Sequence, residues 1–139
     1  MIHFERFLDL LQQVETGAEE NGGEGAIGDE GKALGPLQIH EPCYRDAMEH
    51  LANSLGLPLQ ALLQTLPYKF CAHELFSRVV AYIYLKRYCQ NGMKNGNWEE
   101  LARTWNGGPT WFNSDKGRYD TEKYWKKVRA KFHKYEKGV

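Results

Sequence analysis

Residues 4–17 read FERFLDLLQQVETG, and their apolar side chains recur at the spacing of one helix face. Gly17 follows the pattern as a natural C-cap, so we predict a helix that ends at Thr16. Positions 4, 8, 11 and 15 share one stripe, which makes Glu15 the last residue of an otherwise apolar face. A carboxyl group there loses hydration, which disfavours its charged form and raises its pKa. The alternative interpretation is a Glu15 that points into water at a frayed helix end.

The segment after this helix is rich in glycine. Seven of the 14 glycines lie within residues 17–35, together with several acidic residues. This composition predicts a loop, with a short hairpin around residues 26–33. Long loops inside a compact domain are usually functional or disordered, so the acidic segment is a candidate for function.

The remainder of the chain is predicted to be helical, because its apolar residues recur at helical spacing between turn residues. The expected helices cover about 42–53, a short stretch after Pro58, 72–89, 98–105 and 121–135. With the loop and hairpin, this pattern predicts a mainly α fold of the α+β kind. We expect a single domain over residues 1–139.

Two of these helices carry further signals. Asn97 and Glu100 have the spacing of a capping box, so a helix should begin at Trp98. The helix over 72–89 is expected to be the longest and to end at Asn91-Gly92. Its broad apolar face consists of Leu75, Phe76, Val79, Val80 and Ile83.

Length and composition exclude several protein classes. The chain has 139 residues and a mass of 16.1 kDa. Its 42% hydrophobic and 13% aromatic residues supply a core, which excludes an intrinsically disordered chain. No apolar run approaches the roughly 18 residues of a membrane span, and the N-terminus lacks the pattern of a secretory signal. We therefore expect a protein made in the cytoplasm, with no membrane partner.

Cysteines and histidines form no recognisable site. Cys43, Cys71 and Cys89 are an odd number at wide spacings, which is typical of buried thiols in a reduced compartment. The five histidines show no metal-binding spacing. We therefore expect no cofactor and no metal.

The charges divide unevenly along a chain whose net charge is zero. Residues 1–50 carry 11 acids and three bases, and residues 51–139 carry seven acids and 15 bases. Seven of these bases fall within residues 121–137, largely on the side opposite the aromatic residues there. Such asymmetry indicates either a face that meets an anionic partner or an ordinary solvated surface.

Two carboxyl groups in this pattern suit the cleavage of a glycosidic bond. That reaction needs a carboxylic acid to protonate the leaving oxygen, and commonly a carboxylate to attack the sugar, stabilise its cation or activate water. Glu15 on an apolar stripe suits the proton donor, whereas Asp29 in a polar loop stays ionised. Asp29 follows Glu15 by 14 residues, so a returning loop could bring the two across a cleft.

Three short blocks, in this order, resemble the lysozyme superfamily. They are Val14-Glu15-Thr16-Gly17, Gly35-Pro36-Leu37-Gln38-Ile39 with Tyr44-Arg45-Asp46 after it, and Arg103-Thr104-Trp105-Asn106-Gly107-Gly108-Pro109. The first two are similar to the catalytic Glu-Ser-Gly and Gly-x-x-Gln-Ile blocks of the superfamily. The third is similar to the Arg-Ile-His-Asn-Gly-Gly-Pro block of invertebrate-type, destabilase-like lysozymes. Bacterial lytic transglycosylases are the next most similar group.

The resemblance implies roles for individual residues. Glu15 would be the general acid and Asp29 the second carboxylate. Glu30 is the alternative second carboxylate, because the spacing between Asp29 and Gly35 differs by one residue from that of the invertebrate-type pattern. The residues that would bind the glycan are Gln38, Asn106, Gly107, Trp105 and Trp111.

The chain departs from the invertebrate-type pattern in two ways. It lacks the disulfide framework, with Leu34 where a cysteine precedes the glycine. Trp105 stands where the invertebrate-type block has a histidine before Asn-Gly-Gly. The resemblance therefore gives less support to the isopeptidase activity that is attributed to destabilases. Both departures suggest a bacterial or phage relative that is made in the cytosol and acts on the cell wall, by an export route that the sequence does not specify.

The resemblance favours a monomeric muramidase, which hydrolyses the β-1,4 bond between N-acetylmuramic acid and N-acetylglucosamine in peptidoglycan. The alternatives are a lytic transglycosylase that uses Glu15 alone, a chitin-directed hydrolase and a non-catalytic glycan-binding module. Nucleic-acid binding through the basic last helix is disfavoured, because the acidic first third would repel phosphate and no binding motif is visible. The expected partner is peptidoglycan or a related N-acetylglucosamine polymer.

Overall fold

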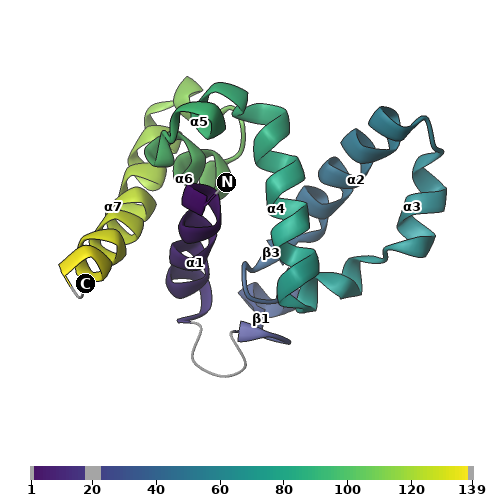
Figure 1. The fold of residues 1–139 in the computed structure, drawn as a ribbon, viewed down its shortest axis with the longest axis horizontal. Coiled ribbons are helices and arrows are strands. Elements are labelled where there is room, and N and C mark those ends of the chain that lie inside the picture. Colours follow the sequence, from purple (N-terminus) through teal and green to yellow (C-terminus); the bar gives the residue numbers. More distant parts are fainter. Residues whose placement is uncertain (1, 18–22, 138–139) are drawn as a thin grey trace. The chain divides into compact units, whose positions relative to one another are not determined.

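The computed structural model describes residues 2–17 and 23–137, with side chains at 4–17 and 23–133. It is mainly helical with a small antiparallel sheet, which confirms the predicted fold class (Figure 1). The chain forms two compact units: a central unit of residues 15–87, and a terminal unit of residues 1–14 and 88–139. The single domain expected from the sequence stays a prediction.

The glycine-rich part of the central unit contains a three-stranded sheet. Its strands are β1 (Ile27–Gly28), β2 (Ala33–Leu34) and β3 (Ile39–His40), in that order and antiparallel. A 3-10 turn, η2 (Asp29–Gly31), joins β1 to β2. The predicted hairpin is therefore confirmed. The third strand was not predicted, because two residues are too few to show an alternating pattern.

Helices make up the rest of the central unit. α2 (Glu41–Leu55) has Pro42 in its first turn and ends at Gly56, whose φ of 69° is the left-handed C-cap conformation. α3 (Leu59–Thr65), the 3-10 helix η3 (Tyr68–Ala72) and α4 (Glu74–Tyr88) follow. The fully buried core includes Leu37, Ile39, Ala47, Met48, Cys71, Val80 and Leu85.

The apolar face predicted for α4 is correct in part, because Val80 is fully buried and Phe76 and Ile83 are half-buried, but two of its five residues are exposed. Leu75 is 78% exposed and Val79 is 42% exposed. The helix buries Ser77, Val80, Ala81, Tyr84 and Leu85. α4 is apolar on more than one side, so hydrophobicity alone did not identify the buried stripe. The small Ser77 and Ala81 give that stripe room for close packing.

The predicted end of α4 is wrong. The helix ends at Tyr88, and Gly92 lies inside α5 (Gln90–Asn95). A Cβ atom on Gly92 would lie 2.9 Å from Glu100 Oε2, so this glycine is required by packing and does not stop a helix. Gly96, with a φ of 69°, is the C-cap of α5.

The terminal unit contains α1 (Ile2–Thr16) as far as Val14, α5, α6 (Trp98–Gly107), the 3-10 helix η4 (Trp111–Asn113) and α7 (Asp115–Lys137). Asn97 caps α6 as predicted, because its Oδ1 accepts a hydrogen bond from the Glu100 N–H at 3.2 Å. α7, and not α4, is the longest described helix. The unit buries Phe7, Leu8, Leu10, Leu11, Leu101, Ala102, Thr121 and Val128.

α7 begins earlier than residue 121, where we predicted its start. Ser114 Oγ accepts a hydrogen bond from the Gly117 N–H at 2.9 Å, which caps the helix before Asp115. Among residues 2–17 and 23–137, no helix has the length and apolar character needed to cross a bilayer.

Candidate active site

The C-terminal end of α1 is held against the second block of the resemblance. Thr16 Oγ1 donates a hydrogen bond to the carbonyl oxygen of Pro36 at 3.3 Å. Gly23 packs on the same hydroxyl, since a Cβ atom there would lie 2.6 Å from Thr16 Oγ1. The neighbouring Glu15 is half-buried, and Gly17 ends the helix with a φ of 73°. The structure therefore joins two blocks that lie 20 residues apart in sequence.

Gly35 fits a position that no other residue suits. Its φ is 81°, and a Cβ atom would collide with the carbonyl oxygen of Cys71 and lie 3.0 Å from Ala72 Cα. Its N–H donates to the Ala26 carbonyl oxygen at 2.7 Å. The Gly35-Pro36 turn is thus fixed on both sides, by the hairpin and by η3.

Gln38 binds the backbone of the hairpin. Its Nε2 donates to the carbonyl oxygens of Gly35 at 2.9 Å and of Ala26 at 3.4 Å. A Cβ atom on Gly28 would collide with Gln38 Oε1, so the amide packs directly on that strand. These contacts give the side chain a structural function. Its predicted role in lining a sugar cleft stays a prediction.

Asp29 lies on the exposed turn between β1 and β2. Its Oδ2 is 2.7 Å from His40 Nε2, in a pair whose side chains are 63% and 48% exposed, respectively. The hydrogen bond with His40 holds the pKa of Asp29 below its usual 3.8, as predicted for a carboxylate that stays ionised.

The backbone around Asp29 is strained. Asp29 and Glu30 both adopt left-handed conformations, with φ values of 49° and 57°. Such conformations cost a non-glycine residue about 1–2 kcal/mol and are concentrated at functional sites. Glu30, the rival second carboxylate, is exposed on the same turn.

Sequence reasoning missed His40 as the partner of Asp29. Pairing of Ala33 with His40 across β2 and β3 brings the histidine to the end of the sheet where the Asp29 turn lies. The available signal was a histidine just after an apolar strand residue. That signal is too common to single out one of five histidines.

The remaining candidates belong to the terminal unit. Asn106 and Gly107 are the last residues of α6, so the helix extends two residues beyond its predicted end at residue 105. A Cβ atom on Gly107 would collide with Thr121 Cγ2, which explains this glycine by the packing of α6 on α7. Asn106 is exposed and lines a polar pocket with Lys116.

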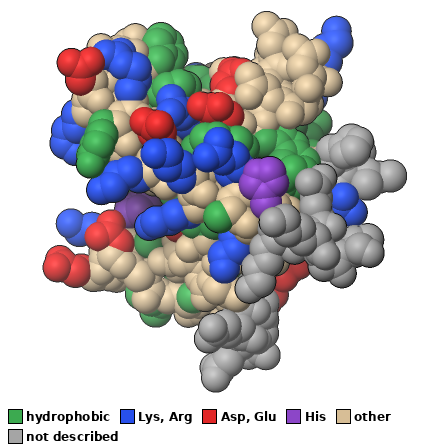
Figure 2. Space-filling model, turned by 90° about the vertical axis from the view of Figure 1, so that its left-hand side faces the viewer, with side chains coloured by type: hydrophobic (Ala, Val, Ile, Leu, Met, Phe, Trp, Pro, Cys, Tyr) green, Lys and Arg blue, Asp and Glu red, His purple; other side chains and the backbone are tan. Residues whose placement is uncertain are grey.

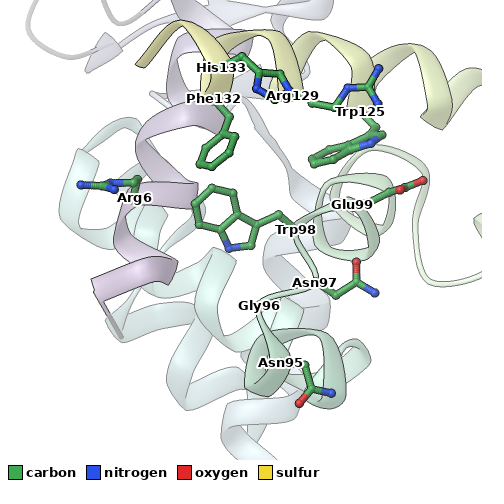
Figure 3. Close-up of a pocket in the computed structure, with 10 residues that line it drawn as sticks. All are labelled: Arg6, Asn95, Gly96, Asn97, Trp98, Glu99, Trp125, Arg129, Phe132 and His133. Carbon is green, nitrogen blue, oxygen red and sulfur yellow. The ribbon is translucent and has the colours of Figure 1, made fainter. Parts of the chain in front are cut away.

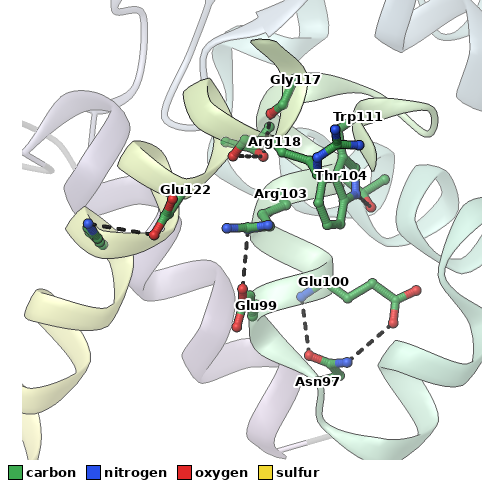
Figure 4. A network of polar contacts seen from close by, with 11 residues as sticks. Asn97, Glu99, Glu100, Arg103, Thr104, Trp111, Gly117, Arg118 and Glu122 are labelled. Carbon is green, nitrogen blue, oxygen red and sulfur yellow. Dashed lines mark hydrogen bonds and ion pairs between the residues drawn. The ribbon is translucent and has the colours of Figure 1, made fainter. Parts of the chain in front are cut away.

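Trp111 is held in a polar network on α6 (Figure 4). Its Nε1–H donates to Thr104 Oγ1 at 3.2 Å, and the Arg103 guanidinium lies 4.8 Å from the ring centre. Arg103 Nε is 3.3 Å from Glu99 Oε2. The network fixes Trp111, whereas its neighbour Phe112 is 55% exposed. Trp105 is half-buried on the same helix.

The structure therefore groups the predicted residues into two sets. Glu15, Asp29, Glu30 and Gln38 lie in the central unit. The terminal unit contains Trp105, Asn106, Gly107 and Trp111. Only the first set includes carboxyl groups from the prediction, so we describe the candidate active site within the central unit.

The cysteine thiols are not suited to nucleophilic chemistry. All three are free; Cys71 and Cys89 are buried, and Cys43 is half-buried. Burial raises the pKa of Cys43 and of Cys71 to about 12, which keeps both protonated at neutral pH. Within the described part of the chain, no group of three or more His, Cys, Asp or Glu side chains is arranged to hold a metal ion.

Comparisons of the chain with protein-family models, curated proteins and solved structures found no match. The resemblance to lysozymes stays a prediction that depends on three sequence blocks.

Proposed function

We propose that the protein is a lysozyme-type glycosidase that cleaves the β-1,4 bond between N-acetylmuramic acid and N-acetylglucosamine in peptidoglycan. One observation carries the proposal: the contact between Thr16 and Pro36 fixes the half-buried Glu15 in the same compact unit as an exposed carboxylate, Asp29, of lowered pKa. An acid and an ionised carboxylate in different environments are the two groups that glycoside hydrolysis uses.

In this mechanism Glu15 donates its proton to the glycosidic oxygen as the bond to the sugar breaks. Asp29 then stabilises the positive charge on the ring or bonds to it, and water completes the hydrolysis. His40 holds Asp29 in its charged form through their hydrogen bond at 2.7 Å. The protein would act as a monomer on the cell wall.

A lytic transglycosylase is the second candidate, and the Asp29–His40 pair favours it. The hydrogen bond already gives the Asp29 carboxylate a structural function, and a reaction that uses Glu15 alone does not need Asp29 as a catalytic group. In that reaction Glu15 protonates the glycosidic oxygen as its bond to the muramic acid C1 breaks. The 6-hydroxyl oxygen of the same sugar then bonds to C1 and gives its proton to the Glu15 carboxylate, and a 1,6-anhydro end forms. A chitin-directed hydrolase would use the same carboxyl groups on a polymer of N-acetylglucosamine.

The decisive experiment measures wall lysis by Glu15→Gln and identifies the new sugar ends by mass spectrometry. Glutamine cannot donate the proton, so we expect lysis to fall by about 100- to 10,000-fold. Glu49→Gln removes an exposed carboxylate of α2 and is the matched control. Unchanged lysis by Glu15→Gln would refute the glycosidase and leave a non-catalytic glycan-binding module.

Asp29→Asn separates the two reactions. Reducing ends, together with a large loss of activity in this variant, identify a hydrolase with two carboxylates. Anhydro ends, together with nearly normal activity, identify the transglycosylase.

A further inference from the structure

A concave site lies in the terminal unit, which contains neither Glu15 nor Asp29 of the proposed mechanism. It is a pocket of about 730 Å³ between the start of α6, the C-terminal half of α7 and Arg6 of α1 (Figure 3). Pockets of 300–1,000 Å³ are of the size that holds a small organic ligand. Its lining residues are Arg6, Asn95, Gly96, Asn97, Trp98, Glu99, Trp125, Arg129, Phe132 and His133.

Aromatic rings form the apolar side of this pocket. Trp98 packs edge-on against Phe132, with ring centres 5.0 Å apart, and against Phe7 at 5.8 Å. Phe7 is fully buried, so the core holds the indole of Trp98 in place. Trp98, Trp125 and Phe132 are themselves only half-buried. The pocket therefore presents fixed rings that are partly open to a ligand.

Positive charge forms its polar side. Arg129 is exposed on α7, beside the exposed His133 (Figure 3). The one acid in the lining, Glu99, is 3.3 Å from the Arg103 guanidinium, which offsets its charge. The N-terminus of α6 also faces the pocket and contributes the positive end of the helix dipole.

The terminal unit that contains the pocket also has an excess of positive charge. The terminal unit carries 12 Lys and Arg against eight Asp and Glu, whereas the central unit carries six against ten. In Figure 2, many Lys and Arg side chains gather on the face that is turned toward the viewer. An anionic ligand is therefore favoured over a cationic one.

We propose that this pocket binds an acidic saccharide, that is, a sugar ring that bears a carboxylate. The ring would pack its C–H face on Trp98 or Trp125, and its carboxylate would accept the paired N–H groups of Arg129. The exposed side-chain amide of Asn95 can donate to and accept from hydroxyl groups. The site goes beyond the proposed function, because none of its residues lies in the unit of Glu15 and Asp29.

The test is a titration of tryptophan fluorescence with N-acetylmuramic acid. Two of the four tryptophans line the pocket, so binding should change the emission. The neutral N-acetylglucosamine is the matched probe, and we expect it to bind at least tenfold more weakly. Benzoate is an aromatic acid without a sugar ring, and it should also bind more weakly.

Variants on α7 test the assignment of the charge. Arg129→Gln should weaken binding of N-acetylmuramic acid at least tenfold. Lys127→Gln removes the same charge from an exposed position outside the pocket and should leave binding unchanged. Equal losses in both variants, equal affinity for the two sugars, tighter binding of benzoate, or no change in emission would each overturn the proposal. The Glu15→Gln variant should bind N-acetylmuramic acid as tightly as the wild type. The binding proposal can therefore be refuted while the glycosidase proposal stands, and the glycosidase proposal can be refuted while the binding proposal stands.

Discussion

Replacement of Gly35 by alanine tests the packing that positions Glu15. Gly35 and Gly31 both have left-handed backbones, with φ values of 81° and 88°. They differ in their surroundings, because a Cβ atom on Gly35 would collide with the Cys71 carbonyl oxygen, whereas one on Gly31 has open space. Gly31→Ala therefore shares the backbone strain of Gly35→Ala without its collision.

The expected magnitudes follow from these two contributions. A left-handed alanine costs about 1–2 kcal/mol, and both variants should lose this much free energy of unfolding. The collision at Gly35 is with backbone, which cannot rotate away, so overpacking adds about 1–3 kcal/mol. We therefore expect a loss of about 2–5 kcal/mol for Gly35→Ala, a large part of the roughly 5–15 kcal/mol typical of a folded domain.

Urea denaturation, followed by circular dichroism, measures the loss of unfolding free energy in Gly35→Ala and in Gly31→Ala. All four tryptophans lie at positions 98–125 of the terminal unit, so fluorescence in the same samples reports that unit separately. The larger loss for Gly35→Ala should appear in the dichroism, and wall lysis should fall with it because Thr16 is bonded to Pro36. If Gly35→Ala were as stable as Gly31→Ala, the close approach to Cys71 would be wrong.

Four further predictions concern pKa values and capping. His40→Ala should raise the pKa of Asp29 toward 3.8, because their hydrogen bond is the main cause of its lowering; a carbon NMR titration that shows no change would contradict this. A pKa that is lower in the folded state stabilises the protein above pH 3.8, so the stability difference between the wild type and Asp29→Asn should fade as the pH drops below that value. Cys43 and Cys71, whose pKa values burial raises to about 12, should react slowly with a thiol reagent at neutral pH and rapidly in urea; equal rates would show that they are accessible. Asn97→Ala should cost about 1 kcal/mol of unfolding free energy in urea titrations, and no loss would mean that its cap contributes nothing.

The predictions that held depend on local interactions. The end of the first helix at Gly17 and the cap at Asn97 follow from backbone hydrogen bonds between residues a few positions apart. Residue types at neighbouring positions determine such bonds. The start of α7 was missed although Ser114 gives an equally local signal, because Gly117 interrupts the helical pattern.

The mainly α fold class, most helix positions and the glycine-rich acidic segment between helices could all be predicted from residue types and their spacing. Three contacts could not be predicted in this way: the side of α4 that is buried, the approach of Gly35 to Cys71, and the pairing of His40 with Asp29. These contacts join residues that are distant in sequence, and their free energy depends on the shape and charge of surfaces that meet only after the chain has folded.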